Sequence, residues 1–540
     1  MRIDKVKIED FKNLKKFEID IDENQWETIF IGQNATGKSN FFEALVLIFK
    51  HLDIKLNESP PFNFDIHYIC RGNKINVQVI DNKYEFTVWN EFEIVDGKTV
   101  WINKKEISRA EFEREKETLL PNHVFIYYSG TSSRLQNVYI EHQKRYYLEI
   151  IKPKAKGRKV DSLRRIFLVQ NIHSKFALLS FFIFGDKKET VLKFLKDELK
   201  IIDFVSLLLV LKQPVWSNTK SEKDMFWKSG GLVRTFLDQL WEYSLAPIYN
   251  TESIPVSYKQ NETQERLYLF ISEREKLEQL AKTHYKNKIQ LFNAFESTYI
   301  SDLVEDIRVN VKRKTAKKKI VFGEMSEGEQ QLLTVFGLLR FLKDEESLIL
   351  LDEPDTHLNP IWKWKYMEYF KVIVGRAETT QIFINTHDPL VIGSLDKEQI
   401  RIFRSDENGN IKAEQPDIDP KGLGVAGILT SELFGLPTTL DKETQELLDE
   451  RNNLLYKQST GELNEAEQAR IRELFLKINS LGFTYTFKDP LYSKFLTAMG
   501  KVKEFDSKLQ SKEEIETQNK VALSILEELF QKEKDDLHKQ

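Results

Sequence analysis

The chain of 540 residues has a single cysteine, Cys70, and no excess of either charge, with 80 basic side chains against 84 acidic ones. One cysteine excludes a disulfide framework and a zinc site built from several cysteines, and it fits a reducing cytoplasm. Balanced charge excludes a general polyelectrolyte attraction to nucleic acid, so such binding would need local basic patches. Because 41% of the residues are hydrophobic, the chain can bury a substantial core.

Long hydrophobic runs are also lacking. The two longest lie at 176–184 and 201–211, and both are too short and too interrupted to span a bilayer. We interpret each of them as a buried helix. The first residues alternate charged and apolar side chains, which is not the pattern of a signal peptide. The sequence therefore predicts a cytoplasmic protein without a membrane partner.

Strand patterns dominate the beginning of the chain. Residues 1–31 contain two alternating stretches and a short buried run, 74–102 alternate like an antiparallel meander, and 123–130 form another buried run. From about 140 to 305 the pattern becomes helical, with aromatic and charged side chains interleaved. This segment lacks the long uninterrupted heptads of an extended coiled coil.

Strand patterns return in the second half of the chain, at 307–322, 347–354 and 381–389. A hairpin follows, and Asn408-Gly409 marks its turn. The final part is charged and helical. Its three candidate helix starts are Asn464, Asp489 and Ser511.

Residues 32–39, GQNATGKS, match the pattern G-x-x-x-x-G-K-[ST] without a mismatch. A short apolar strand precedes them and an amphipathic helix follows, as in a phosphate-binding loop. Lys38 is expected to reach the β- and γ-phosphates of a nucleotide, and Ser39 to hold Mg²⁺ through its hydroxyl. A glycine-rich turn with a surface lysine is the alternative, which the flanking elements disfavour. The residues predicted to contact the nucleotide here are Gly32, Gln33, Asn34, Ala35, Thr36, Gly37, Lys38, Ser39 and Asn40.

Two carboxylates follow the apolar run 348–351, at the end of an expected central strand. Asp352 could hold a Mg²⁺-bound water, and Glu353 could polarise an attacking water as a general base. His387 comes after a second apolar run and could contact the γ-phosphate or that water. A lone histidine at a strand end is more often a structural hydrogen-bonding residue, but its expected place beside Asp352 favours a catalytic role.

The stretch 323–330, GEMSEGEQ, opens a long apolar helix. Ser326 with Glu329 three residues later has the spacing of a capping box. The helix start would also present glycine, serine and backbone N–H groups outward, where an anion can bind.

These segments together resemble the ABC-type ATPases, in particular the branch containing SMC, RecF and the OLD-family proteins. The resemblance implies that Ser326, Gly328 and Glu329 form the signature that contacts the γ-phosphate held by an opposite subunit. It also implies that 355–360 is the loop crossing the dimer interface and that His387 is the switch histidine. For the glutamine of the family's Q-loop, the candidates are Gln78 and Gln136.

The tail after His387, in particular 427–436, and the stretch 127–135 are similar to the PtuA family. These are the ATPases of Septu antiviral systems, also found beside some retron reverse transcriptases. The resemblance implies ATP and Mg²⁺ as cofactors and a homodimer or higher homo-oligomer. It also implies a PtuB-like HNH nuclease subunit as a partner, with nucleic acid or a retron reverse transcriptase–DNA complex as a further one.

Patterns and resemblance together predict an α/β fold: an ABC-type P-loop ATPase head with a mixed central sheet and an antiparallel β subdomain, a helical insertion, and a helical C-terminal region. The first half of the head is assigned to 1–139, the insertion to 140–305, the second half of the head to 306–415, and the C-terminal region, for partner binding or oligomerisation, to 416–540.

Two alternatives are disfavoured by the motifs. The ATP-binding subunit of a membrane transporter places its signature much closer to the phosphate loop than Ser326 lies to Gly32. An OLD-type nuclease needs a glutamate after a strand and a later D-x-D, but 390–540 contain no strand–Glu–Gly element. We interpret the lone D-x-D at 417–419 as a solvated loop. Scattered histidines and one cysteine also disfavour an HNH site, so we expect any nuclease activity in a partner.

A RecF- or SMC-like DNA-repair ATPase is the third alternative. It should show a long coiled coil or a basic channel. The local basic clusters at 152–165 and 311–319 could bind phosphate backbones, or they could be a solvated loop and a hairpin tip.

Overall fold

The computed structural model divides the chain into two compact units, Met1–Leu436 and Pro437–Gln540. The residues whose structure is described are 1–56, 58–96, 98–130, 134–151, 164–185, 190–214, 224–314, 320–342, 345–460, 464–481, 520–528 and 530.

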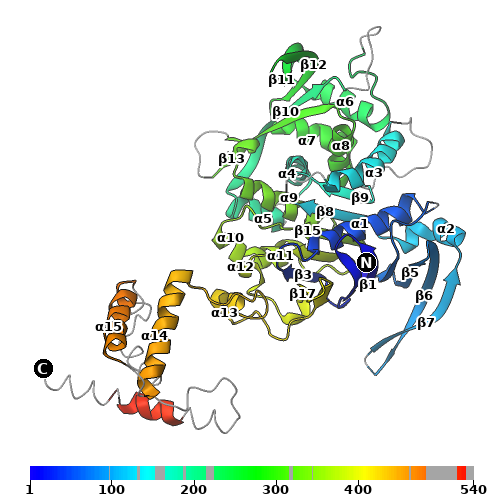
Figure 1. Cartoon of the computed structure of the whole chain (residues 1–540). Helices are drawn as coiled ribbons and strands as arrows, with labels where there is room; N and C mark the ends of the chain where they lie inside the picture. The colour runs from blue at the N-terminus through cyan, green and yellow to red at the C-terminus, as the bar shows by residue number, and fades with distance from the viewer. Residues whose placement is uncertain are drawn as a thin grey trace. The chain divides into compact units, whose positions relative to one another are not determined.

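The first unit is built on a seven-stranded sheet in the order β18-β17-β3-β16-β15-β8-β9 (Figure 1). Neighbouring strands pair in parallel except β17 and β18, which form the predicted hairpin with Gly409 at φ +80° in its turn. The sheet is therefore mixed, as predicted. Its strands are β3 (Glu27–Gly32), β8 (His123–Tyr128), β9 (Ile166–Val169), β15 (Ser347–Asp352), β16 (Gln381–Asn385), β17 (Ile400–Ser405) and β18 (Ile411–Glu414).

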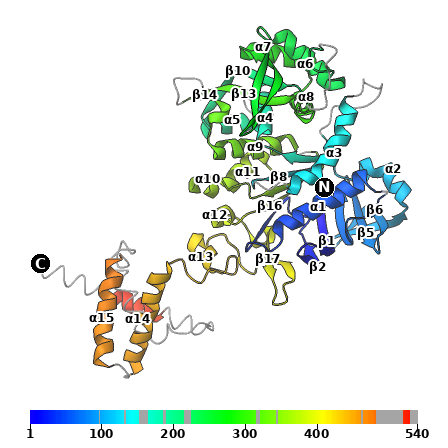
Figure 2. The same cartoon turned by 45° about the horizontal axis from the view of Figure 1, so that its top comes forward.

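Both faces of this sheet are covered, because successive side chains of a strand point to opposite faces. In β15, Leu348 and Leu350 join the core on the side of α1, whereas Ile349 and Leu351 join the core that includes α4, α9 and α11. Figure 2 shows α1 and α9 on opposite sides of β8 and β16. The helices are α1 (Lys38–Ile54), α4 (Ile172–Phe184), α9 (Glu327–Leu342) and α11 (Tyr366–Val374).

A second sheet is antiparallel, in the order β2-β1-β4-β5-β6-β7, and packs into the same core as α1. The meander predicted for 74–102 is confirmed as part of it. Figure 1 shows β6 and β7 running out as a long hairpin. The elements are β1 (Arg2–Phe11), β2 (Leu14–Asp20), β4 (Phe64–Cys70), β5 (Asn73–Ile80), β6 (Lys83–Val95), β7 (Lys98–Ile107) and the adjoining α2 (Arg109–Leu119).

The prediction of a helical insertion at 140–305 is wrong, because the segment also contributes strands. A third sheet, antiparallel, has the order β11-β12-β10-β13-β14, and three of its strands come from the insertion. Its strands are β10 (Ile201–Lys212), β11 (Ile248–Ser257), β12 (Gln260–Ile271), β13 (Val304–Arg313) and β14 (Ile320–Val321). The helices around it are α3 (Arg134–Ile150), α5 (Thr190–Asp197), α6 (Gly231–Tyr243), α7 (Arg274–His284) and α8 (Lys288–Ile300).

The error has a physical cause in the two apolar runs. The run at 176–184 is part of α4, as predicted, but the run at 201–211 is β10. Periodicity does not separate a short buried strand from a buried helix. What decides is that β10 lies between β12 and β13, which supply partners for its backbone on both sides.

The second unit contains α14 (Lys442–Thr460) and α15 (Glu465–Ser480), which pack through buried leucine and isoleucine side chains. Asn464 begins α15 as predicted, since its side chain accepts a hydrogen bond of 2.8 Å from the Glu467 amide. Asp489 and Ser511 lie outside the described residues. Residues 416–436, including α13 (Gly424–Thr430), belong to the first unit, so the division falls after the predicted boundary.

Among the described residues, no helix is long and apolar enough to cross a lipid bilayer.

A buried ionic cluster ties β9 to the insertion helices. Glu296 of α8 accepts a hydrogen bond of 2.9 Å from Arg164, just before β9, and lies 2.6 Å from Nε2 of His173 in α4. All three side chains are almost fully buried. Burial alone would raise the pKa of Glu296, but the charges of His173 and Arg164 outweigh it and hold that pKa below its ordinary value.

Replacing Glu296 by alanine should destabilise the first unit strongly. Glu296→Ala leaves the Arg164 charge buried without its carboxylate, which typically costs about 3–5 kcal/mol. The matched control is Glu278→Ala on α7, whose partner Lys282 is exposed and whose loss should cost below about 1 kcal/mol. Thermal unfolding measures both, and equal melting temperatures for the two variants would contradict this role of the cluster.

Candidate functional site

The candidate site lies where β3, β16, β15 and β8 end. These strands are parallel neighbours, so their carboxyl ends meet at one edge of the sheet. Asp352 lies beside Asn385 and Tyr128 in the register, and Asn385 lies beside Phe30. The segments that follow these strands therefore converge, which is where open α/β sheets bind ligands.

The loop at 32–39 has the backbone of a phosphate cradle. Gly32 has φ +144°, and a Cβ there would lie 2.3 Å from the carbonyl oxygen of Phe403 in β17. Gly37 has φ +89° and precedes α1, where a Cβ would meet Leu14 at 2.8 Å. Both glycines are thus required by conformation and by space. The exposed Ala35 also has a positive φ of +66°, which curls the loop between them.

Lys38 is buried and points back along this loop. Its Nζ donates hydrogen bonds to the carbonyl oxygens of Gly32 at 2.8 Å and Gln33 at 3.0 Å. Burial lowers the pKa of Lys38 to about 8, and the nearby charges of Asp352 and Glu353 oppose that shift. The ammonium therefore remains mostly charged at neutral pH.

The other predicted loop residues surround this lysine. Gln33 and Asn34 are exposed, and the Thr36 hydroxyl donates 2.8 Å to the Gln33 carbonyl. Ser39 is the second residue of α1 and is half-buried. The following Asn40 donates through its side chain to Asn13 at 2.7 Å.

Asn13 is a site residue that the sequence reasoning missed. It lies in the turn between β1 and β2 and donates 2.8 Å to the carbonyl oxygen of Ala35, while its own side-chain oxygen accepts from Asn40. It thereby fixes the loop to the start of α1. The sequence signal was only a polar turn, which predicts no such contact.

Asp352 ends β15 and is 2% exposed. Its Oδ1 accepts a hydrogen bond of 3.0 Å from the Asn385 side chain. Asn385 was also missed, although a polar residue closing the apolar strand 382–384 beside Asp352 is a usable signal. The buried carboxylate is an oxygen donor of the kind that Mg²⁺ prefers.

Glu353 and His387 face each other across the strand ends. His387 Nε2 lies 3.5 Å from Oε1 of Glu353, and both side chains are partly exposed. Glu353 has φ +51°, which is uncommon for a residue other than glycine. Burial and the charge of Lys38 lower the pKa of His387, so its ring is mainly neutral at pH 7. The partly exposed Glu353 carboxylate beside this ring can accept a proton from a water molecule.

The start of α9 is a separate part of the site. Ser326 and Glu329 form the predicted capping box, with the Glu329 amide 3.3 Å from the Ser326 hydroxyl and the Ser326 amide 3.0 Å from the Glu329 carboxylate. That carboxylate also pairs with Arg313. Gly328 packs against His357 in the segment that follows β15, since a Cβ there would lie 2.6 Å from the His357 carbonyl oxygen. These three residues thus contact their own surroundings, and a role toward nucleotide stays a prediction.

The segment after Glu353 is anchored by a buried acid. The Thr386 hydroxyl donates 3.0 Å to Asp355, and Lys363 donates 2.7 Å to Asp388. Burial raises the pKa of Asp355 to about 6, although the Thr386 hydrogen bond opposes it. Two short helices begin beside these residues, α10 (Pro360–Trp364) and α12 (Pro389–Ile392).

The remaining sequence candidates are not brought to this edge. Gln78 is half-buried in β5 of the antiparallel sheet, and the side chain of Gln136 lies outside the described residues. Most of the basic clusters, 152–163 and 315–319, also lie outside them. The three residues 417–419 are exposed, as predicted for a solvated loop.

Comparison with known proteins gives a family model and several relatives. The family model described as "AAA ATPase domain" matches residues 1–392. The Septu protein PtuA of Bacillus mycoides (strain KBAB4) is 25% identical over 207 residues, which cover 35% of this chain and 28% of that protein. The Retron Vc95 probable ATPase of Vibrio cholerae serotype O1 biovar El Tor is 21% identical over 79% of this chain and 78% of its own length.

Among solved structures, the SMC head bound to the C-winged helix domain of ScpA covers 78% of this chain and 98% of its own chain, with 14% identity and a TM-score of 0.33. A TM-score of 0.33 is too low to assign a fold. The fold is assigned from the strand order of the seven-stranded sheet. The match to PtuA spans only about a quarter of the PtuA length.

Asp355→Asn should change how stability depends on pH. Because the folded pKa of about 6 lies above the ordinary value of 3.8, the folded state binds the proton more tightly than the unfolded state. The stability from this group is present below about pH 4 and is lost as the pH rises through about 6. The variant should therefore melt above the parent at pH 8, by a margin that shrinks toward pH 5. A constant margin in thermal unfolding would contradict the raised pKa.

Proposed function

This chain belongs to the AAA ATPase domain family, and we propose that it binds ATP at the carboxyl edge of the central sheet and hydrolyses it. One observation carries the proposal. A glycine-built loop with a buried Lys38 follows β3, and Asp352, Glu353 and His387 lie at or just after the ends of β15 and β16, the next two strands in the sheet order.

The phosphate loop would hold the triphosphate. Residues 32–40 present backbone N–H groups and the start of α1 to the phosphates, and Lys38 would exchange its loop carbonyls for the β- and γ-phosphate oxygens. The Ser39 hydroxyl and the Asp352 carboxylate are oxygen donors suited to Mg²⁺. That ion, when bound, would neutralise charge on the transferred phosphoryl group.

Glu353 would act as the general base toward the attacking water. Its carboxylate is partly exposed and lies 3.5 Å from His387. The neutral imidazole can donate a hydrogen bond to the γ-phosphate or orient the same water. Asp352 is buried whereas Glu353 is partly exposed, and this difference would suit Asp352 to metal binding and Glu353 to reaction with water.

The complete site would use two chains, as a homodimer or higher homo-oligomer. The start of α9, with Ser326, Gly328 and Glu329, would face the γ-phosphate held by the second chain. Because the Ser326 hydroxyl donates to the Glu329 carboxylate at 3.2 Å within the cap, it would have to exchange that carboxylate for the phosphate, and backbone N–H groups and the helix dipole would add to the attraction. This arrangement follows from the resemblance to ABC-type ATPases.

The relatives suggest a biological setting. We propose that this ATPase works in antiviral defence, as part of a PtuA-like complex in which a PtuB-like HNH nuclease subunit cuts nucleic acid. ATP binding between two heads would control that partner. The similarity over most of the chain to a retron ATPase supports a reverse transcriptase–DNA complex as a further candidate partner. A RecF- or SMC-like repair ATPase remains the second candidate.

Glu353→Gln should slow turnover strongly while ATP binding stays intact. Removing a general base typically slows a reaction about 100- to 10,000-fold, whereas Lys38 and the loop are untouched. Steady-state phosphate release and nucleotide binding by fluorescence measure the two effects. The control, Glu368→Gln, makes the same change on the exposed face of α11 and should behave as the parent. Parental turnover in Glu353→Gln would remove the base assignment.

Ser326→Arg should block assembly without blocking ATP binding to a single chain. A large cation at this helix start would fill the space meant for the partner's phosphate and oppose the helix dipole. In the Glu353→Gln background, ATP-dependent dimer formation by light scattering should be lost, whereas Ser326→Thr, which retains a capping hydroxyl, should keep it. If Ser326→Arg assembles and hydrolyses like the parent, Ser326 is only a helix cap.

A further inference from the structure

Gln331 is a buried amide on the second turn of α9, 2% exposed, and it contacts the backbone of two residues that follow β15. Its side-chain oxygen accepts a hydrogen bond of 3.1 Å from the His357 amide. Its side-chain nitrogen donates to the carbonyl oxygen of Glu353 at 3.5 Å. A buried amide with both of these partners fixes their relative positions.

The contact with Glu353 matters because of the backbone there. The φ of +51° is an uncommon conformation for a residue other than glycine, and it persists only when the surroundings impose it. The amide of Glu353 donates 3.0 Å to the Asn385 carbonyl. Its carbonyl oxygen accepts from Gln331 and, at 2.7 Å, from the Thr356 hydroxyl. The direction of the Glu353 carboxylate is therefore set by hydrogen bonds on both sides of the residue.

The same segment touches the start of α9 directly. Gly328 has no room for a Cβ against the His357 carbonyl oxygen, at 2.6 Å, and Gln331 holds the amide of that same His357. Both contacts hold the peptide segment around His357 against α9. A shift of the helix start must therefore move His357 and, through Gln331, the Glu353 carbonyl.

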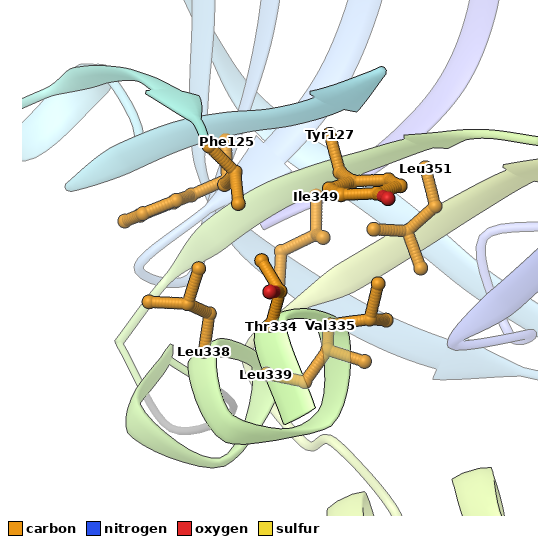
Figure 3. A pocket seen from close by; sticks show the side chains of 9 residues that line it. Phe125, Tyr127, Thr334, Val335, Leu338, Leu339, Ile349 and Leu351 are labelled. Carbon is orange, nitrogen blue, oxygen red and sulfur yellow. The ribbon is translucent and has the colours of Figure 1, made fainter. Parts of the chain in front are cut away.

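Farther along α9 the packing is apolar. A small apolar cavity lies between Thr334 and Leu338 of α9 and Tyr127, Ile349 and Leu351 of the sheet (Figure 3). The side chains around it point toward one another across this gap. All of these side chains are buried, so apolar contacts hold this part of α9 to the sheet. Gln331 supplies the polar contact nearer to the start of the helix.

We propose that Gln331 is a positioning residue that couples the start of α9 to the backbone of Glu353. The inference rests on the proposed role of Glu353 as the general base. Binding of a second chain's phosphate at Ser326 and Gly328 would fix the position of α9. Through its hydrogen bond, Gln331 would then fix the position of the Glu353 carbonyl. The carboxylate would take up its working direction only when the opposite site is engaged.

The first experiment replaces the amide by a side chain of similar length without donors or acceptors of comparable strength. Gln331→Met should lower kcat about tenfold or more, the loss expected when a catalytic group is misplaced. The KM and the affinity of a single chain for ATP should stay at parental values, because the phosphate loop is untouched. The matched control is Thr334→Val, one turn farther along α9, whose hydroxyl bonds only to the Gln330 carbonyl at 2.7 Å; it should keep parental kcat.

A double-mutant cycle separates positioning from a general structural effect. If Gln331 acts through Glu353, Gln331→Met should lower turnover in the parent but add no further loss to Glu353→Gln. If the substitution merely loosens the fold, the two losses multiply, and that outcome overturns the proposal. Gln331→Glu provides a second variant for the same cycle, since it keeps an acceptor for His357 but cannot donate to Glu353.

The outcomes also distinguish this proposal from the proposed function. Absence of ATP turnover in the parent would overturn the ATPase role itself. Turnover in the parent with unchanged kcat in both Gln331→Met and Gln331→Glu would overturn the coupling and leave the ATPase role standing. Loss of kcat in Gln331→Met, with parental ATP affinity and no additivity with Glu353→Gln, would support it.

Discussion

The register of three parallel strands is the constraint on which the rest of the site depends. The Glu353 amide bonds to the Asn385 carbonyl at 3.0 Å, and the Thr386 amide bonds to the Phe30 carbonyl at 3.2 Å. These bonds align the ends of β15, β16 and β3, and the Asn385 side chain closes onto Asp352 at the same level. A slip of one residue would turn each strand's side chains to the opposite face. Asp352 would then leave the edge where Lys38 and His387 lie.

Much of the head could be predicted because its motifs are local. The phosphate loop requires glycines where the backbone takes positive φ, so Gly32 and Gly37 mark it in the sequence as clearly as in the structure. The alternation in β1, β2 and β5–β7, and the apolar runs before Asp352 and His387, likewise report a strand environment directly. The ABC-type AAA ATPase family was predicted from the nucleotide motifs, and the likeness to PtuA from 127–135 and the tail after His387; both are confirmed by the comparisons.

What could not be predicted depends on distant contacts. Asn13 and Gln331 are ordinary polar residues in sequence, and only the fold places them against Ala35 and Glu353. The apolar run at 201–211 carries no period that separates strand from helix, and its partners in β12 and β13 lie far along the chain. The positive φ of Glu353 also has no sequence signal, because the hydrogen bonds that impose it come from other segments.

The strand β9 makes the insertion a part of the central sheet. Its four residues form the outer edge of the central sheet beside β8, yet they belong to the segment 140–305 rather than to either flanking half. The insertion is therefore no detachable module. Excising it would uncover the hydrogen-bonding groups of β8 along one side, and such open edges invite pairing with other chains and aggregation.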